Sequence, residues 1–204
     1  MESNWAAEHL QVIRTLMERS AVYRRALAPI TLMIGILGLV AGGGGWFCGW
    51  DSPRAFGLFW LLVSLMGLGG ALFMVRRQAW QAAEAFWSPP TRRVTQAIIP
   101  SLFSGLVAGM LVWLPSWDNS RQAWWLPPVW MVFYGCALHA AGFFMPRGMR
   151  LFGWLFIVSG CALAVILSSL DGVPPLRLAH WAMGGFFGGM HLAYGIYLYL
   201  TEKG

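Results

Sequence analysis

The stretch FGLFWLLVSLMGLGGALFMV, at residues 56–75, decides the fold class of this chain. It contains 20 residues and no Asp, Glu, Lys, Arg or His. A helix rises about 1.5 Å per residue, so about 20 apolar residues cross the hydrocarbon core of a bilayer. The stretch therefore predicts a transmembrane helix.

Five further apolar stretches lie on both sides of this one. They occupy residues 27–49, 96–116, 126–145, 151–170 and 179–200. Each is a continuous apolar run, whereas the strands of a membrane barrel alternate apolar and polar residues. We therefore expect an all-α integral membrane protein with six transmembrane helices.

The composition of the whole chain agrees with this expectation. Of 204 residues, 11% are charged and 58% are hydrophobic, and the mean hydropathy is +0.59. Ordinary soluble domains carry about 25% charged residues. The 13 Trp and 13 Phe exclude a disordered chain, since disordered segments are poor in aromatic residues.

The basic residues predict the orientation of the six spans. Most of the 14 Lys and Arg residues precede the first span, follow the second or fourth span, or lie in the tail. Only Arg54, Arg121 and Arg177 lie on the opposite side. Basic loops stay on the cytoplasmic side, so we expect both termini on the cytoplasmic side of the membrane. The net charge of +6 then serves orientation and attraction to anionic lipid, because scattered arginines do not make a nucleic-acid patch.

An internal repeat suggests how the spans are organised. Residues 38–54 read GLVAGGGGWFCGWDSPR and residues 105–121 read GLVAGMLVWLPSWDNSR, with nine identities in 17 positions. A fainter third copy follows residue 151. We expect three helical hairpins, 27–75, 96–145 and 151–200, as parallel repeats within a single domain of residues 27–200. In each clear copy, small residues (Gly38 and Gly42, Gly105 and Gly109) would let helices approach closely.

The ends of the repeats carry aromatic and charged residues that could frame an external pocket. We expect most of these residues to act as interfacial anchors and scaffold. The candidates for this outer-loop pocket are Trp46, Trp50, Asp51, Arg54, Trp113, Trp117, Asp118 and Arg121.

Two elements are expected on the cytoplasmic face. Residues 1–26 contain an amphipathic helix with Leu10, Ile13 and Met17 on its apolar face. The loop 76–95 is expected to form an interfacial helix that ends at Pro89–Pro90. Both elements would contact anionic lipid or a protein partner. Residues 201–204 form a short tail that is also expected on the cytoplasmic side. The candidate contact residues of the loop are Arg76, Arg77, Trp80, Trp87, Arg92 and Arg93.

The ionisable side chains expected deepest in the membrane are His139 and His191. Spans 4 and 6 run in the same direction, and the two histidines fall at similar depths. They could bind a b-type haem or another ligand, or they could form hydrogen bonds that only support the structure. His180 is expected at the external end of span 6. No catalytic or metal-binding pattern is present, because the chain has no GxxxxGK[ST] or HExxH motif.

The stretch EAFWSPPTRRV at residues 84–94 and the entry VYRRALAPI at residues 22–30 resemble uncharacterised multi-pass, six-span inner-membrane proteins of bacteria. The resemblance implies a location in the bacterial inner membrane, and it carries no activity or site residues.

These observations favour a non-enzymatic membrane protein with a regulatory, sensory or accessory role. Two alternatives stay open. The chain could be a small-molecule transporter or permease that uses the repeat interface. It could also be a redox subunit that binds haem b through His139 and His191.

Overall fold

The computed structural model describes residues 27–81, 83, 86–114, 119–145 and 147–201. The expected amphipathic helix in residues 1–26, with Leu10, Ile13 and Met17, lies outside the described residues, as do Trp117, Asp118 and most of the tail. All regular secondary structure within the described residues is helical, as expected.

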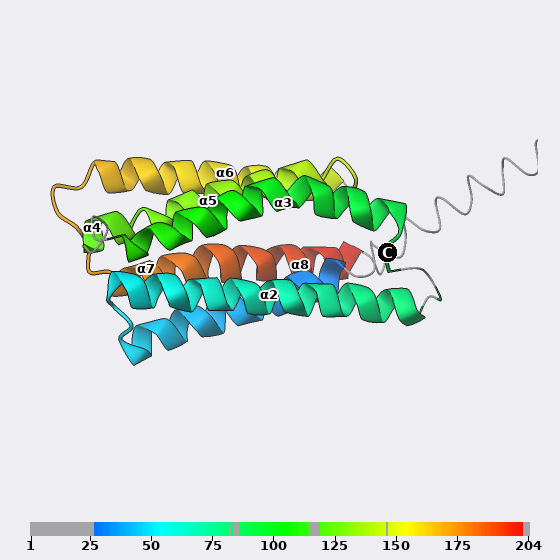
Figure 1. The fold of residues 1–204 in the computed structure, drawn as a ribbon, viewed down its shortest axis with the longest axis horizontal. Coiled ribbons are helices and arrows are strands. Elements are labelled where there is room, and N and C mark those ends of the chain that lie inside the picture. Colours follow the sequence, from blue (N-terminus) through cyan, green and yellow to red (C-terminus); the bar gives the residue numbers. More distant parts are fainter. Residues whose placement is uncertain (1–26, 82, 84–85, 115–118, 146, 202–204) are drawn as a thin grey trace, which may run out of the picture.

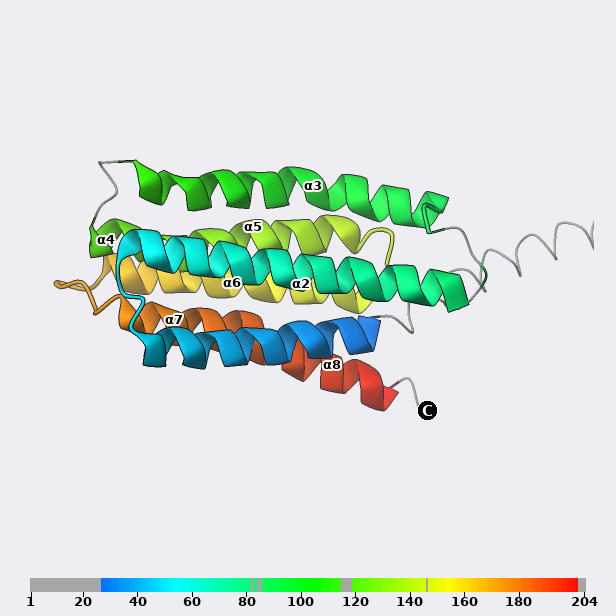
Figure 2. The ribbon, with the colours of Figure 1, turned by 60° about the horizontal axis from the view of Figure 1, so that its bottom comes forward.

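Long helices dominate the chain and alternate in direction along the long axis of the molecule (Figures 1 and 2). The first described helix is Leu27–Cys48, and the others are α2 (Pro53–Gln81), α3 (Pro89–Met110), η1 (Leu111–Trp113), α4 (Ser120–Ala123), α5 (Leu126–Ala141), α6 (Arg147–Ser168), α7 (Arg177–Met183), η3 (Gly184–Gly189) and α8 (Met190–Thr201). Of these, η1 is a 3₁₀ turn and η3 is a π-helix. The segments α7, η3 and α8 follow one another without a break, and we call them the α7–η3–α8 run.

The molecule has two ends, which the connections between the helices define. One end carries residues 49–52, α4 and residues 169–176, and we call it the α4 end (Figure 1). The other end carries Arg76, Arg77, Arg92 and Arg93 near the connection between α2 and α3, and we call it the arginine end.

Four helices are long and apolar enough to cross a membrane. They are Leu27–Cys48, Pro53–Gln81, Thr91–Trp113 and Gly148–Ser168. The other two expected spans coincide with α5, which has 16 residues, and with the α7–η3–α8 run, where a π-helix interrupts the α-helical pattern.

The boundaries around the predicted interfacial loop differ from the expectation. The helix α2 continues to Gln81, and α3 begins at Pro89, so only a short connection separates them. The pair Pro89–Pro90 starts a helix here, with Ser88 at the N-cap position. Proline fits the first helical positions, because the N–H that it lacks would have no partner there.

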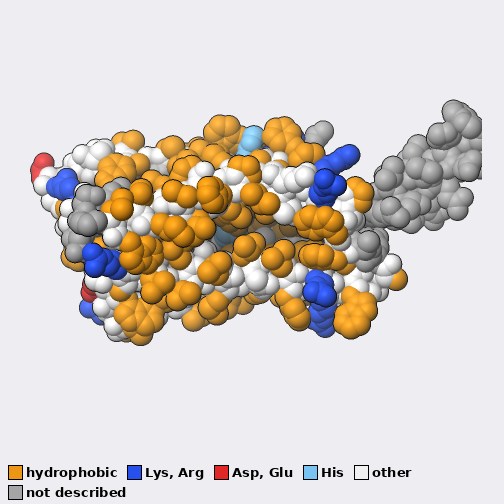
Figure 3. Space-filling model, in the orientation of Figure 1, with side chains coloured by type: hydrophobic (Ala, Val, Ile, Leu, Met, Phe, Trp, Pro, Cys, Tyr) orange, Lys and Arg blue, Asp and Glu red, His pale blue; other side chains and the backbone are white. Residues whose placement is uncertain are grey.

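Apolar side chains cover the middle of the molecule, and in this view the charged side chains lie towards its two ends (Figure 3). Many large apolar side chains are exposed on this belt, including Phe73 at 67%, Leu151 at 72% and Val165 at 64%. Water would make such a surface unfavourable, whereas lipid tails match it. The exposed belt and the four long apolar helices together describe a membrane protein.

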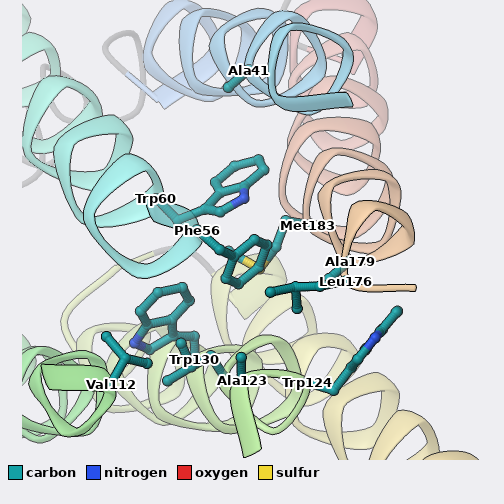
Figure 4. Close-up of a cluster of buried hydrophobic side chains, with 11 residues drawn as sticks. Ala41, Phe56, Trp60, Val112, Ala123, Trp124, Trp130, Leu176, Ala179 and Met183 are labelled. Carbon is teal, nitrogen blue, oxygen red and sulfur yellow. The ribbon is translucent and has the colours of Figure 1, made fainter. Parts of the chain in front are cut away.

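Two clusters of buried side chains hold the helices together. The first lies at the α4 end, and Figure 4 shows Phe56 and Trp60 reaching from α2 into its centre. The second joins the first helix to α5, α6 and α8, with Phe152 and Phe156 among its buried members. Each cluster surrounds one buried histidine.

Close glycine contacts join the first helix to the α7–η3–α8 run. A Cβ added to Gly38 would lie 2.7 Å from the Cα of Gly188, and one added to Gly42 would lie 2.8 Å from the Cα of Gly184. The predicted small-residue face of the first helix is therefore a backbone-to-backbone contact.

The matching glycines of the second repeat have a different role. The indole N–H of Trp130 donates to the Gly105 carbonyl at 2.8 Å, and a Cβ added to Gly109 would lie 2.9 Å from the same indole ring. Gly105 and Gly109 thus make room for a side chain of α5, and not for another helix backbone.

Candidate functional site: two buried histidines on one helix run

The α7–η3–α8 run carries a buried histidine on each side of its π-helix. The exposed fraction is 0% for His180 and 1% for His191. A buried imidazole needs hydrogen-bond partners for both ring nitrogens, because an unpaired polar group in an apolar interior is costly. The partners of the two rings therefore indicate what each histidine does.

Both ring nitrogens of His180 are engaged by residues that precede α7 by more than 100 positions. The indole N–H of Trp60 donates to Nδ1 at 3.2 Å, and Nε2 lies 3.2 Å from the backbone carbonyl oxygen of Trp50. An indole nitrogen only donates and a carbonyl only accepts. His180 is therefore the neutral tautomer with its proton on Nε2.

The chain makes space for this ring with a glycine and encloses it with aromatic side chains. A Cβ on Gly45 would clash with the His180 imidazole, so only glycine fits at this position of the first helix. The rings of Phe56 and Phe59 meet the imidazole edge-on at 5.0 and 5.6 Å between centroids. His180 thus links the first helix, α2 and α7 at the α4 end.

His191 adopts the opposite tautomer. Its Nδ1–H donates to the backbone carbonyl oxygen of Phe187 at 2.6 Å, and its Nε2 accepts a hydrogen bond from the Tyr134 hydroxyl at 2.7 Å. The first bond stays within the helix run and the second reaches α5. His191 therefore connects α8 to α5 while its own helix fixes the orientation of its ring.

Aromatic rings enclose His191 as well. The ring centroids of Tyr134, Phe152 and Phe156 lie 5.1 to 5.3 Å from its own. The edge-to-face contact with Phe152 has an interplanar angle of 85°. These contacts leave the imidazole surrounded by side chains of the protein.

The structure does not bring the predicted pair His139 and His191 together. His139 contacts Phe143 and Trp154, with centroid distances of 5.4 and 5.6 Å. On α6, Trp154 lies between Phe152 and Phe156, which face His191. Helical residues two positions apart point about 200° from each other, so the two histidines lie on opposite faces of α6. A haem held by both rings would need a different helix arrangement.

The described candidates for an outer-loop pocket are spread over several elements at the α4 end, from the first helix and α2 to η1 and α4. The Trp50 ring packs on Phe59 at 4.7 Å, while Asp51, Arg54 and Arg121 are exposed. Trp113 is 41% exposed at the end of η1. The backbone carbonyl of Trp50 contacts His180, and the Trp46 ring contacts Trp181 on α7.

Arg177 was not among these candidates, but its side chain contacts Trp46 at the α4 end. Its Nε–H donates to the carbonyl oxygen of Trp46 at 2.8 Å, and its guanidinium carbon lies 4.6 Å from the centroid of the Trp46 ring. The Trp46 ring also contacts Trp181 at 6.0 Å. The first helix and α7 are thus joined at the α4 end by a cation–π contact and a hydrogen bond.

The candidate contact residues of the loop lie at the arginine end. The side chains of Trp80 and Trp87 are 86% and 58% exposed. Exposed arginines accompany them. They are Arg76, Arg77, Arg92 and Arg93.

Sequence reasoning missed the tryptophans that act as buried hydrogen-bond donors. Trp60 donates to His180, Trp130 donates to Gly105, and Trp124 donates to the carbonyl oxygen of Pro174 at 2.7 Å. Tryptophan is abundant in the chain, and interfacial anchoring was the expected role. One signal was available for Trp60, which lies well inside the stretch 56–75, where an indole N–H needs a protein partner.

The chemistry of this site is that of neutral imidazoles used as connectors between helices. Within the described residues, no three His, Cys, Asp or Glu side chains gather in a group that could hold a metal.

The chain was compared with known protein families, curated proteins and solved structures. No family model matches the chain, and neither a curated protein nor a solved structure is similar to it.

Proposed function

We propose that this chain is a six-span protein of the bacterial inner membrane with a non-enzymatic regulatory, sensory or accessory role. Its helices would form three hairpins, each starting and ending at the arginine end. That end would face the cytoplasm, because basic residues are retained there. The arginine end would be the surface that receives or passes on a signal.

The hydrogen bonding of the two buried histidines carries this proposal. His180 and His191 use both ring nitrogens on partners from the same chain. An imidazole that ligates a haem iron or a metal needs one ring nitrogen for that bond. The transmembrane body therefore has the properties of a rigid support, in which buried polar groups fix how the helices pack.

The arginine end supplies the groups that a partner would recognise. Arg92 and Arg93 are exposed in the first turn of α3, and Arg76 and Arg77 are exposed near the end of α2. Trp80 and Trp87 are exposed between these two pairs. Paired arginines with exposed tryptophans suit an anionic membrane surface or an acidic segment of a cytoplasmic or membrane protein.

Affinity purification from native membranes tests the proposal. We expect a defined protein to be recovered with the full chain in mild detergent. The double variant Arg92→Gln/Arg93→Gln should lower its recovery several-fold, because it removes charge from the proposed contact surface. Deletion of residues 2–20 tests the contribution of the N-terminal segment.

The matched control is Arg54→Gln/Arg121→Gln, which removes the same charge from the α4 end. It should leave the recovery unchanged. The proposal is contradicted if no protein is recovered consistently, or if both double variants lower the recovery equally.

A further inference from the structure

A groove opens on the apolar belt between α6 and the α7–η3–α8 run. Its volume is about 510 Å³. From α6 it is lined by Leu155 and Ser159, and from the helix run by Trp181, Gly185, Gly189 and Ala193, among others. Ser159 contributes a hydroxyl, Leu155, Trp181 and Ala193 contribute apolar or aromatic surface, and the two glycines contribute backbone.

The glycine pairs of GGFFGG explain why the groove exists. Gly184 and Gly188 pack against the backbone of the first helix, as described above. Gly185 and Gly189 follow them in sequence, and a Cβ at either position would meet nothing within 4 Å. One glycine of each pair therefore closes a helix contact, and the other leaves the floor of the groove open.

The cationic residue Arg177 lies on α7 one turn before the lining residue Trp181, on the side of the groove nearer the α4 end. Arg177 precedes the lining residue Trp181 by four positions, so the two share one face of α7. The Trp46 ring lies under the Arg177 guanidinium and beside Trp181, with centroid distances of 4.6 and 6.0 Å. Among the described residues, the structure pairs Arg177 with no carboxylate. No hydrogen bond joins its other N–H groups to a described residue, and these groups suit an anion.

We propose that the groove binds one acyl chain of an anionic membrane phospholipid, whose phosphate is held by Arg177. The groove is long enough for a lipid tail, because the 12 helical positions from Trp181 to Ala193 rise about 18 Å. A guanidinium and a phosphate form strong charge-assisted hydrogen bonds. Trp181 at the same end suits the headgroup depth, where tryptophan is enriched.

The arginine favours a lipid over a second transmembrane helix. A neighbouring helix would bury Arg177 against apolar side chains, which is costly unless it also supplies an acid. A phospholipid brings the apolar chain and the anion in one molecule. The proposal rests on the membrane embedding in the proposed function, and it is independent of any regulatory role.

Photocrosslinking in lipid nanodiscs tests this site. The probe is a phosphatidylglycerol with a diazirine in its acyl chain, present as a small fraction of a phosphatidylcholine bilayer, and labelled peptides are mapped by mass spectrometry. We expect labelling to concentrate on the peptides that contain Ser159 and residues 181–193. Gly185→Leu/Gly189→Leu should fill the groove and lower that labelling at least fivefold.

Matched controls separate the groove from the general surface. Gly69→Leu on α2 also places a side chain where a Cβ meets nothing within 4 Å, and it should leave the groove labelling unchanged. Arg177→Gln should remove the preference for phosphatidylglycerol over a phosphatidylcholine probe, whereas Arg177→Lys should keep most of it. Arg121→Gln should have no effect.

The outcomes that overturn the proposal are distinct from failure of the membrane assignment. Uniform labelling around the belt would show an embedded protein without a lipid site. Unchanged groove labelling in the double leucine variant would exclude the groove. A crosslink through Ser159→Cys to a second copy or another protein would show that a helix occupies it.

Discussion

At the scale of single residues, the two buried histidines act as connectors with opposite tautomers. His180 accepts a hydrogen bond from the Trp60 indole and donates one to a backbone carbonyl, whereas His191 donates to its own helix and accepts from Tyr134. Each arrangement satisfies the ring completely. Truncating either histidine would therefore leave unpaired polar groups in an apolar interior.

The first prediction concerns His180→Ala. This change leaves the Trp60 N–H and the Trp50 carbonyl without their partner, and we expect a loss of about 1–3 kcal/mol in stability. Unfolding of the purified protein in mixed micelles measures it. His139→Ala is the control, because His139 is only half-buried, and it should cost clearly less. Equal losses in both variants would contradict the role assigned to His180.

The second prediction concerns haem. Because His139 and His191 lie on opposite faces of α6 and Tyr134 occupies Nε2 of His191, we expect no Soret band in the purified protein, with or without added haem. An absorbance spectrum measures this. A Soret band that disappears in both His139→Ala and His191→Ala would support the haem-binding alternative instead.

At the scale of elements, the segment GGFFGG controls how the α7–η3–α8 run packs. Its residues Gly184 and Gly188 touch the backbone of the first helix. Its two phenylalanines, Phe186 and Phe187, pack against the second buried cluster. A π-helix widens the turn at this point, and such segments often mark positions under special constraint.

A neighbouring glycine pair gives the third prediction. A Cβ added to Gly188 would lie 2.5 Å from the backbone nitrogen of Leu39, so Gly188→Ala should cost about 1–3 kcal/mol through overpacking. Gly189→Ala meets no atom within 4 Å and should be neutral or slightly stabilising. Thermal unfolding of both variants in the same detergent measures the difference. Similar stabilities for the two would argue against the close helix contact.

At the scale of the whole molecule, the charged groups and the apolar belt define how the protein would sit in a membrane. The belt lies between two ends that carry the charges (Figure 3). The ends differ, because the exposed aspartates Asp51 and Asp171 lie at the α4 end and two pairs of arginines lie at the other. The positive-inside rule then favours one orientation.

The fourth prediction is the accessibility of single cysteines on intact cells. The native Cys48, Cys136 and Cys161 are first replaced by serine or alanine. A membrane-impermeant maleimide should label Ser52→Cys and Gly172→Cys, which lie at the α4 end, and should not label Trp80→Cys. Lysed cells should give labelling at all three positions. The reverse pattern would contradict the proposed orientation, and labelling of only one of the first two would contradict the six-span topology.

The sequence by itself determined the helical class and the membrane character of this protein. Both follow from local properties, namely runs of about 20 apolar residues and a shortage of charge, which act on each segment without reference to its neighbours. Four of the expected spans agree with helices that are long and apolar enough to cross a bilayer. The close approach of the first helix at Gly38 and Gly42 was also predictable, since small residues spaced by four leave a flat helix face.

The tertiary structure alone decided which polar groups meet. Similar depth in the membrane suggested that His139 and His191 form a pair. The depth of a residue does not determine the direction in which its side chain points around the helix axis. In the structure, the two imidazole rings contact opposite sides of α6. The partners of His180 and His191 come from residues up to 130 positions away in sequence. A hydrogen bond of this kind depends on the direction of both side chains, which only the packing of all the helices sets.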